Sequence, residues 1–243
     1  MTTTFPSRAV LLGLILGLAA CSVPDGPVDV HDPYETRNRK VHEFNKGLDR
    51  SVVRPVARAY GTAVPQPVRA GVANFADYLD TPKYILNDVA QGNGRDAVHN
   101  VFRFAFNTVF GFGVLDPATE AGLERRSTGF GETLYVWGVP EGAYLEAPVF
   151  GPSTERDTAG RIVDIVTNPV SYVLEDEAAA IPIVAGALTG LNARYEFGDT
   201  IDSVLYESAD SYAQTRSIYL QNRRFELGQE TDDFDFDPYE DFE

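Results

Sequence analysis

The sequence has little cysteine and histidine, and it has far fewer basic than acidic residues. One of its 243 residues is a cysteine, Cys21, and three are histidines. A single cysteine excludes an intrachain disulfide and any zinc or iron–sulfur site that needs several thiolates. The histidines lack the spacing of a helical metal site. With 36 acids against 20 bases, the formal charge is -16, which argues against binding to nucleic acid. We therefore expect neither a metal, a cofactor nor a nucleic-acid partner.

Motifs for catalysis are also missing. Gly92 to Ala97 imitate the dinucleotide fingerprint G-x-G-x-x-A, but the preceding residues read as helix rather than as a buried strand. No G-x-S-x-G serine elbow occurs. Asp157 and Asp164 lie seven residues apart on an expected helix, where they are expected to face solvent or neighbouring bases. His99 is a lone histidine, which is more often packed than catalytic. We expect the protein not to be an enzyme.

The amino terminus has the pattern of an export signal. Arg8 precedes an apolar run over residues 9–20, and small residues directly precede Cys21. Twelve helical residues span about 18 Å, well short of the roughly 30 Å hydrocarbon core of a bilayer. Residues 1–20 are therefore interpreted as a signal peptide rather than as a permanent membrane span.

The segment Leu18-Ala19-Ala20-Cys21 resembles the bacterial lipobox. That resemblance implies cleavage before Cys21, a diacylglycerol on its sulfur and an acyl chain on the new amino terminus, which together give stable anchoring. The alternative is a secreted protein with a free thiol. Ser22, in place of the aspartate that would retain a lipoprotein in the inner membrane, favours the outer membrane.

Both ends of the predicted mature chain differ from its middle. Residues 21–31 are rich in proline and aspartate, and we interpret them as a tether. Residues 226–243 hold nine acids and no base, which predicts a disordered, solvated tail. A composition that is 44% hydrophobic and 12% aromatic is ample for a packed domain in between, over residues 32–225.

Hydrophobic periodicity in that domain is mainly helical. Alternation typical of strands is scarce, and it is found at residues 133–139 and 144–150, so we expect a mainly α fold with at most a small β-hairpin. Helices are expected over residues 41–52, where the helix would stop near Pro55, and over 67–79, 82–90, 160–174 and 199–225.

Two further segments are unusually apolar. Residues 178–193 contain no charged side chain. Over residues 97–110, the apolar side chains of a helix cover an arc of about 240°, which leaves a narrow polar stripe. The stripe consists of Asp96, Asn100, Arg103 and Asn107. Such helices lie either at the centre of a soluble core or against hydrocarbon.

A set of short motifs, in order along the chain, resembles the MlaA (VacJ) family of outer-membrane lipoproteins. The resemblance covers residues 32–168 in addition to the lipobox. Its motifs are Asp32-Pro33-Tyr34-Glu35, Asn38-Arg39, Phe44-Asn45, Val68-Arg69-x-Gly71, Asn74-Phe75, Gln91-Gly92, Arg103-Phe104, Asn107-Thr108, Asp116-Pro117-Ala118, Phe130-Gly131-x-Thr133-Leu134, Trp137-Gly138-Val139, Pro148-x-x-Gly151-Pro152-Ser153 and Arg156-Asp157.

The resemblance implies a ring-like helical body in the inner leaflet of the outer membrane, anchored on the periplasmic side, with a central amphipathic channel. Phospholipids misplaced in the outer leaflet would enter that channel and pass to a periplasmic carrier of an ABC-type lipid transport system. A trimeric porin would be a further partner. The polar stripe Asp96, Asn100, Arg103 and Asn107 is the candidate channel lining. The alternatives are a structural or interaction lipoprotein without lipid transfer, and a phospholipid hydrolase.

Family members also have a glycine-rich loop that shapes the channel, and residues 111–130 match it. The candidate gating residues here are Gly111, Gly113, Asp116, Gly122 and Gly129. Glycines give such a loop conformational range, but they serve plain turns equally well. The chain departs from the family pattern at Arg37 and in the glycine run around Gly113.

Overall fold

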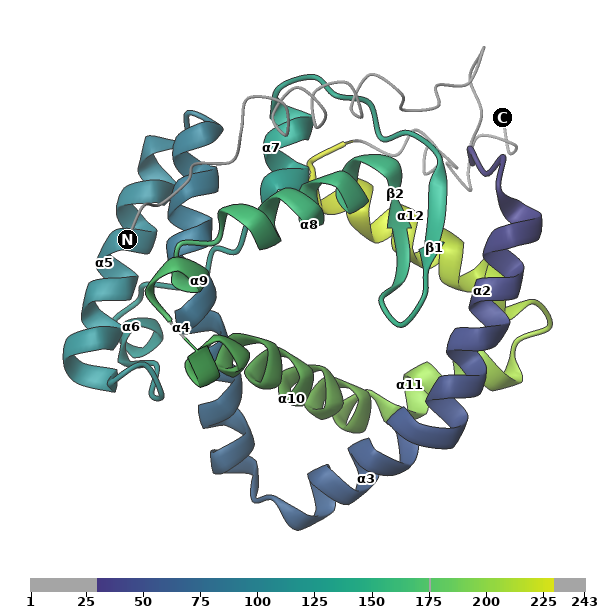
Figure 1. The fold of residues 1–243 in the computed structure, drawn as a ribbon, viewed down its shortest axis with the longest axis horizontal. Coiled ribbons are helices and arrows are strands. Elements are labelled where there is room, and N and C mark those ends of the chain that lie inside the picture. Colours follow the sequence, from purple (N-terminus) through teal and green to yellow (C-terminus); the bar gives the residue numbers. More distant parts are fainter. Residues whose placement is uncertain (1–29, 175, 230–243) are drawn as a thin grey trace, which may run out of the picture.

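The computed structural model describes residues 30–174 and 176–229, which form a closed ring of helices around a central opening (Figure 1). The predicted signal peptide, Cys21 and most of the predicted tether and acidic tail lie outside these residues. The expected mainly helical, ring-like fold with one small hairpin is confirmed. The elements are α2 (Glu35–Leu48), α3 (Arg54–Ala63), α4 (Gln66–Ala90), α5 (Gly94–Gly111), α6 (Pro117–Glu120), α7 (Phe130–Val136), β1 (Tyr144–Ala147), β2 (Gly151–Thr154), α8 (Glu155–Thr167), α9 (Val170–Val173), α10 (Ile181–Glu196), α11 (Gly198–Asp202) and α12 (Ser211–Glu226).

Two prolines lie within longer helical runs than the sequence predicted. The first helix was expected to stop near Pro55, but the chain passes through a π-helical turn, Asp49–Val53, directly into α3. Pro55 falls in the first turn of α3, where a helix does not need the missing N–H. Pro82 lies inside α4, so the two helices expected over 67–79 and 82–90 are one. Packing of α4 against α5, α7 and α10 outweighs the local penalty.

The predicted strand over residues 133–139 is wrong, because most of this segment belongs to α7. The carboxylate of Glu132 accepts a hydrogen bond of 3.0 Å from the Gly129 N–H, which is one half of a helix capping box. Thr133 and Leu134 are fully buried. A stable helix start and the packing of α7 against α8 therefore override the strand-like alternation.

The prediction of a small hairpin is confirmed, but the strand expected over residues 144–150 ends at Ala147, and the second strand, Gly151–Thr154, was not predicted. Strands β1 and β2 pair antiparallel, with Tyr144 opposite Thr154 and Ala147 opposite Gly151. Val149, in the turn between them, has a positive φ of 71°, which is uncommon for a β-branched residue. In Figure 1 this turn reaches into the central opening.

The last third of the chain is more broken than predicted. The helix expected over 160–174 ends at Thr167, and Pro169 precedes the short α9. The helix expected over 199–225 is divided into α11, a π-helical turn and α12. The division occurs because Asp210 caps α12, with its carboxylate accepting a 3.0 Å hydrogen bond from the Ala213 N–H.

Burial in the ring is reversed relative to a water-soluble domain. Among the described residues, 19 buried side chains are polar or charged and 10 are hydrophobic. Helix α5 is the clearest case, because Asn100, Arg103 and Asn107 of its polar stripe are buried while Val98, Phe102 and Phe110 are each more than half exposed. A soluble core is therefore the wrong interpretation of its apolar arc, which suits an apolar environment. In the described ranges, no helix combines the length and hydrophobicity needed to cross a membrane.

Ion pairs between distant segments hold the ring together. Arg194 of α10 binds Asp49, and Arg216 of α12 binds Asp32, ahead of α2, at 2.6 Å. A small cluster of Tyr144, Tyr212 and Leu220 joins the hairpin to α12. Because buried polar side chains outnumber buried hydrophobic ones among the described residues, these polar contacts contribute much of the contact between distant parts of the ring.

Candidate functional site: the central opening

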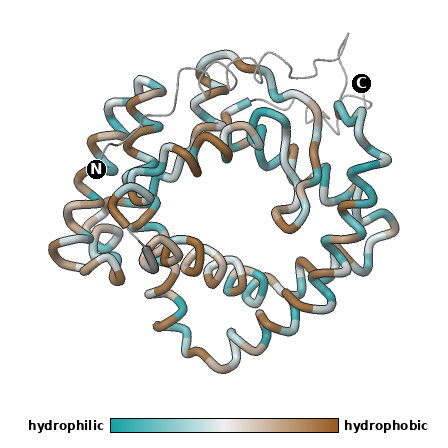
Figure 2. Tube along the Cα trace, in the orientation of Figure 1, coloured by the Kyte–Doolittle hydropathy of each residue, from teal (hydrophilic) through white to brown (hydrophobic). Residues whose placement is uncertain are grey.

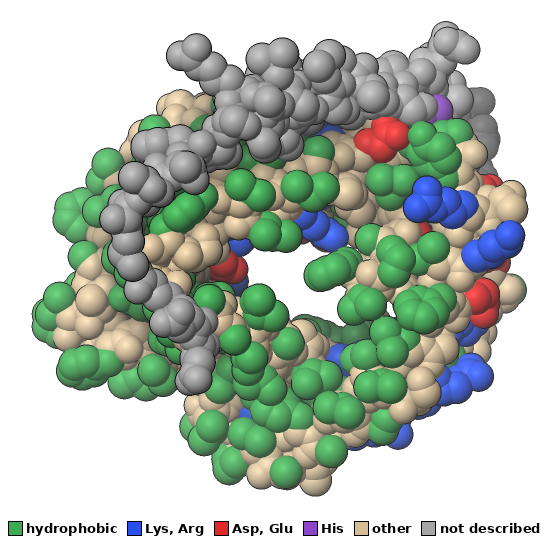
Figure 3. All heavy atoms as spheres, in the orientation of Figure 1, with side chains coloured by type: hydrophobic (Ala, Val, Ile, Leu, Met, Phe, Trp, Pro, Cys, Tyr) green, Lys and Arg blue, Asp and Glu red, His purple; other side chains and the backbone are tan. Residues whose placement is uncertain are grey.

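The central opening remains clear when all heavy atoms are drawn (Figure 3). In the view of Figure 1, α10 runs along its lower margin and α8 along its upper margin. The hairpin turn borders it from the right. Helix α10 contacts both α3 and α4. At Gly61 of α3 the contact is so close that a Cβ atom would lie 2.2 Å from Tyr195 Cγ.

One side of the opening is hydrophobic. Figure 3 shows apolar side chains along its lower margin, over α10, and at the hairpin. In Figure 2 the hairpin turn is strongly hydrophobic. Ile183 of α10 is 74% exposed and Phe150 of the hairpin turn is 76% exposed. The segment expected to be a charge-free helix thus forms an apolar wall.

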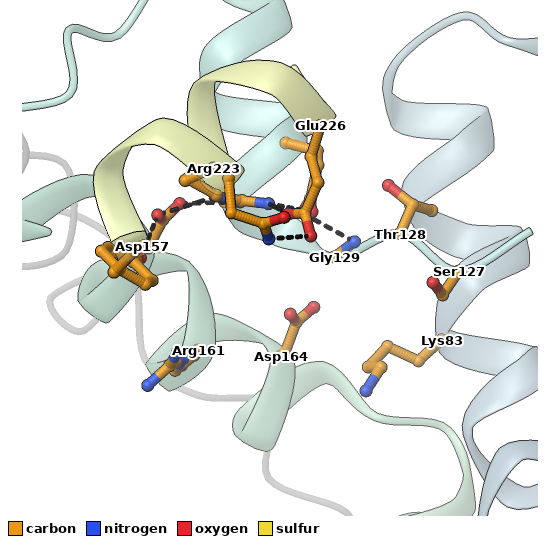
Figure 4. Close-up of a pocket in the computed structure, with 13 residues that line it drawn as sticks. Lys83, Ser127, Thr128, Gly129, Asp157, Arg161, Asp164, Arg223 and Glu226 are labelled. Carbon is orange, nitrogen blue, oxygen red and sulfur yellow. Dashed lines mark hydrogen bonds and ion pairs between the residues drawn. The ribbon is translucent and has the colours of Figure 1, made fainter. Parts of the chain in front are cut away.

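The other side carries charge. Acidic and basic side chains border the opening on its upper and left margins in Figure 3. Between α4, α7, α8 and α12 lies a cavity of about 330 Å³, here called the charged cavity (Figure 4). It is lined by Lys83, Ser127, Thr128, Gly129, Gly131, Glu132, Asp157, Arg161, Asp164, Tyr219, Asn222, Arg223 and Glu226.

Arg223 organises one half of the charged cavity. Its guanidinium donates hydrogen bonds of 2.8 and 2.9 Å to Asp157 and one of 2.7 Å to Glu132, while Tyr219 donates one of 2.7 Å to Asp157. Burial raises the pKa of Asp157, but the hydrogen bonds from Arg223 outweigh it and hold the pKa below its ordinary value. Asp157 therefore faces a neighbouring base, one of the two placements expected for it.

Asp164 has a different environment in the other half. Its two oxygens accept hydrogen bonds of 3.0 Å from Asn87 Nδ2 and from the Phe130 N–H. Within the described ranges no base lies within ion-pair distance of it, and burial raises its pKa. In Figure 4 the Asp164 carboxylate points into the cavity, and Lys83 reaches it from the opposite wall with its ammonium turned away from the carboxylate. Asp164 is thus half-buried and forms no ion pair at contact distance, but the nearby charge of Lys83 acts on it and opposes the effect of burial on its pKa, so it faces a neighbouring base at longer range.

Sequence reasoning did not identify this cavity. Lys83, Arg161 and Asp164 belong to no motif, and Lys83 is separated from the other two by about eighty positions. The one available signal was the spacing of Arg161 and Asp164, since residues three apart share a helix face. In the part of the chain that the structure describes, no group of three or more His, Cys, Asp or Glu side chains is arranged to hold a metal ion.

The predicted channel-lining residues lie elsewhere. Asn100, Arg103 and Asn107 are at most 6% exposed. Arg103 donates to Asp116 at 2.6 Å and Asn107 to the same carboxylate at 2.9 Å. Asn100 binds Asp88 and Asp96 binds Arg126, so the polar groups of all four residues are engaged between α4, α5 and the loop after α5. Figure 1 places α5 on the outer side of α4. Their role as channel lining stays a prediction that this placement does not support.

The predicted gating loop packs beside α5. Asp116 caps α6, and the hydrogen bonds that its carboxylate accepts from Arg103 and Asn107 hold the loop. Gly113 has a φ of +73°, and a Cβ there would lie 2.8 Å from the Tyr78 ring. Gly122 also has a positive φ, of +82°. Gly111 ends α5, whereas Gly129 precedes α7 and lines the charged cavity. Gating by this loop stays a prediction.

Comparisons with known proteins agree on one family. A family model described as MlaA lipoprotein matches residues 30–226. The intermembrane phospholipid transport system lipoprotein MlaA of Escherichia coli K12 is 33% identical over 224 residues, covering 89% of this chain and 86% of that protein. The protein of the same name in Haemophilus influenzae is 30% identical to this chain, and the match covers 91% of each of the two proteins. A solved structure described as "Structural basis for maintenance of bacterial outer membrane lipid asymmetry" matches with a TM-score of 0.69 at 30% identity, over 81% of this chain and 98% of that one.

Proposed function

The chain belongs to the MlaA lipoprotein family, and on that premise we propose that it removes misplaced phospholipids from the outer leaflet of the outer membrane through its central opening. The phospholipids pass to a periplasmic lipid carrier. This is a transport function in which no bond is made or broken, so the protein is not an enzyme.

The two unlike sides of the opening carry this proposal. A phospholipid headgroup leaves water only at high cost unless polar groups receive it. Charged side chains border the opening on one side, where the charged cavity lies between the surrounding helices, while α10 and the hairpin turn offer apolar surface to the acyl chains on the other. On such a path a phospholipid keeps its headgroup beside polar side chains and its acyl chains beside apolar ones.

The exposed apolar surface supports a position in the membrane. Val101, Phe102 and Val109 of α5 are each about half exposed or more, and exposed apolar area of this kind is stable against hydrocarbon. The ring sits in the inner leaflet of the outer membrane, open to the periplasm, with acyl chains on Cys21 as its anchor. A trimeric porin, and a lipid carrier that serves an ABC-type transporter, are its partners.

The proposal is tested on whole cells. Cells that lack the protein are labelled with a membrane-impermeant probe for phospholipid headgroups, beside cells complemented with wild type or with Cys21→Ala. We expect surface phospholipid to rise on deletion, and to return to normal with wild type but not with Cys21→Ala. Unchanged surface phospholipid, with wild-type expression and lipidation verified, contradicts transport and favours the structural-lipoprotein alternative. Release of fatty acid from labelled lipid by the purified protein contradicts a purely non-enzymatic role.

A further inference from the structure

We propose that the charged cavity binds the headgroup of a zwitterionic phospholipid that carries a primary ammonium, with the phosphate between Lys83 and Arg161 and the ammonium against Asp164. This inference rests on the proposed function and names the lipid class that the opening prefers. The class is that of phosphatidylethanolamine.

The charges of the cavity are only partly matched to one another. Arg223 lies within 3.2 Å of Glu132, Asp157 and Glu226. It neutralises part of the charge of these three acids, and its own charge is balanced by them. Outside this group, the cavity has one acid, Asp164, and two bases, Lys83 and Arg161. These three groups are available to a ligand that contains both signs of charge.

Asp164 suits an ammonium group. Each of its oxygens accepts one hydrogen bond from the protein, and a carboxylate oxygen has a second acceptor site. Figure 4 shows the carboxylate facing the cavity. An ammonium group brings three donors and a positive charge. It would stabilise the ionised form of Asp164, which burial otherwise disfavours.

Lys83 and Arg161 suit a phosphate. The Lys83 ammonium is 3.1 Å from Asp80; the Lys83 side chain is 19% exposed and that of Asp80 40%, so water reaches the pair from the Asp80 side and weakens it. Arg161 is exposed and forms no ion pair with any residue in the described ranges. Guanidinium and ammonium groups form charge-assisted hydrogen bonds with phosphate oxygens.

The spacing fits a headgroup in which two carbons separate the phosphate from the nitrogen. Arg161 and Asp164 are three residues apart on α8, so their side chains start about 5–6 Å apart on one helix face. The volume of about 330 Å³ lies within the range of small-molecule sites, about 300–1,000 Å³. A glycerol headgroup of net negative charge has no cation for Asp164 and is repelled by it.

Competition between two lipids tests the inference. The full-length lipidated protein, purified in a nonionic detergent, is mixed with equal amounts of phosphatidylethanolamine and phosphatidylglycerol of identical acyl chains. Native mass spectrometry then gives the ratio of the two bound lipids. We expect an ethanolamine-to-glycerol ratio of about ten in wild type, the effect of one good ion pair. A ratio near one overturns the inference.

Variants locate the preference. Asp164→Asn is expected to bring the ratio close to one, whereas Asp199→Asn, which removes an exposed acid from α11, leaves it near ten. An unchanged ratio in folded Asp164→Asn overturns the inference. Because Asp164 also binds Asn87 and Phe130, helix content is checked by circular dichroism.

Arg161→Gln keeps the test decisive if Asp164→Asn does not fold, since Arg161 is exposed and has no ion pair in the described ranges. We expect it to lower the occupancy of both lipids about fivefold, relative to Arg95→Gln as the control. Unchanged occupancy contradicts the phosphate site.

The two proposals fail in different ways. Equal binding of both lipids overturns only the headgroup preference. Wild-type protein that binds neither lipid counts against the transport function as well, and the surface-phospholipid measurement decides that question independently.

Discussion

Arg194 and Asp49 lie 145 residues apart in the sequence and meet in a two-pronged ion pair, with Arg194 Nε and Nη2 each 2.8 Å from an oxygen of the Asp49 carboxylate. Both side chains are nearly buried. Burial raises the pKa of Asp49, but hydrogen bonds from Arg194 and Tyr206 outweigh it and leave the pKa below its usual value. The pair ties α10 to the turn between α2 and α3.

Breaking this pair will destabilise the ring. Arg194→Gln leaves the Asp49 carboxylate buried without its cation, and we expect a loss of about 3–5 kcal/mol in the free energy of unfolding. Arg58→Gln removes a 63% exposed arginine that lies 3.5 Å from Asp202, and it is expected to cost less than about 1 kcal/mol. Urea unfolding in detergent, followed by circular dichroism, measures both. Similar losses of stability for the two variants would contradict the stabilising role of the Arg194–Asp49 pair.

The buried part of the α5 polar stripe gives a second prediction, which distinguishes a structural role of its residues from a channel-lining role. Arg103→Gln leaves Asp77 and Asp116 without the guanidinium that lies 3.4 and 2.6 Å from them, so we expect a loss of about 3–5 kcal/mol in the free energy of unfolding. Arg95→Gln is the control, because Arg95 is exposed at the start of the same helix. Wild-type stability with impaired lipid removal would instead support the channel-lining role.

The crossing of α7 and α8 predicts a steric effect. A Cβ atom at Gly160 would lie 2.3 Å from the backbone nitrogen of Gly131, and a backbone atom cannot rotate away. Gly160→Ala is therefore expected to lower the free energy of unfolding by about 1–3 kcal/mol. Gly186→Ala, in α10, meets open space and should raise it by roughly 0.5–1 kcal/mol. Thermal melting of the two variants side by side tests this difference in sign.

Asp210 predicts a pH dependence. Hydrogen bonds of 3.0 and 2.9 Å from Arg39 lower the pKa of Asp210 to about 2. An aspartate in an unfolded chain has a pKa of about 3.9. Because the folded-state pKa is the lower one, the stabilisation is fully present above about pH 4 and is lost as the pH falls to about 2.

Asp210→Asn isolates this contribution, since asparagine caps a helix as well as aspartate does. At pH 7 wild type should exceed the variant by less than about 1 kcal/mol in the free energy of unfolding, because the Asp210 side chain is 44% exposed. We expect most of the difference to be lost by pH 2 in urea titrations, where Asp210 is half protonated even in the folded state. A difference that is undiminished at pH 2 would contradict the pair as its source.

The hydrophobic side of the opening predicts a functional effect. Phe150, in the hairpin turn, is 76% exposed, so Phe150→Ser should change the free energy of unfolding by no more than about 0.5 kcal/mol. If acyl chains pass this turn, the serine variant will restore lipid removal incompletely in cells that lack the protein, while Phe150→Leu will restore it. Surface phospholipid labelling distinguishes the two, and equal complementation would argue against contact of this turn with lipid.

Sequence periodicity predicted much of the fold but not the orientation of its helices. The arc of apolar residues over 97–110 was visible, yet the usual rule that apolar faces turn inward is reversed in α5, where Arg103 is buried and Phe102 is exposed. Spacing alone carries no information on which medium surrounds a helix. This is why residues such as Asn100, predicted to line a channel, lie inside a helix contact.

Local sequence patterns led to a wrong prediction at α7, and no local pattern predicted the charged cavity. Alternation suggested a strand, while the pair Gly129 and Glu132, which starts the helix, was not used. The cavity brings Lys83 of α4 beside α8, and that meeting depends on the closure of the ring. The ring-like shape itself was predicted only through family motifs, because helix propensities do not specify how helices are arranged.

The polar interior also affects how the ring responds to temperature. The heat-capacity change of unfolding grows with the apolar surface that becomes exposed and falls with the polar surface. Here arginines, aspartates and asparagines occupy much of the interior, and many large apolar side chains are already exposed in the folded state. For the ring in aqueous surroundings we therefore expect a small heat-capacity change per residue for a chain of this size. A small value flattens the stability curve, so the ring keeps a nearly constant margin against unfolding from cold to warm conditions.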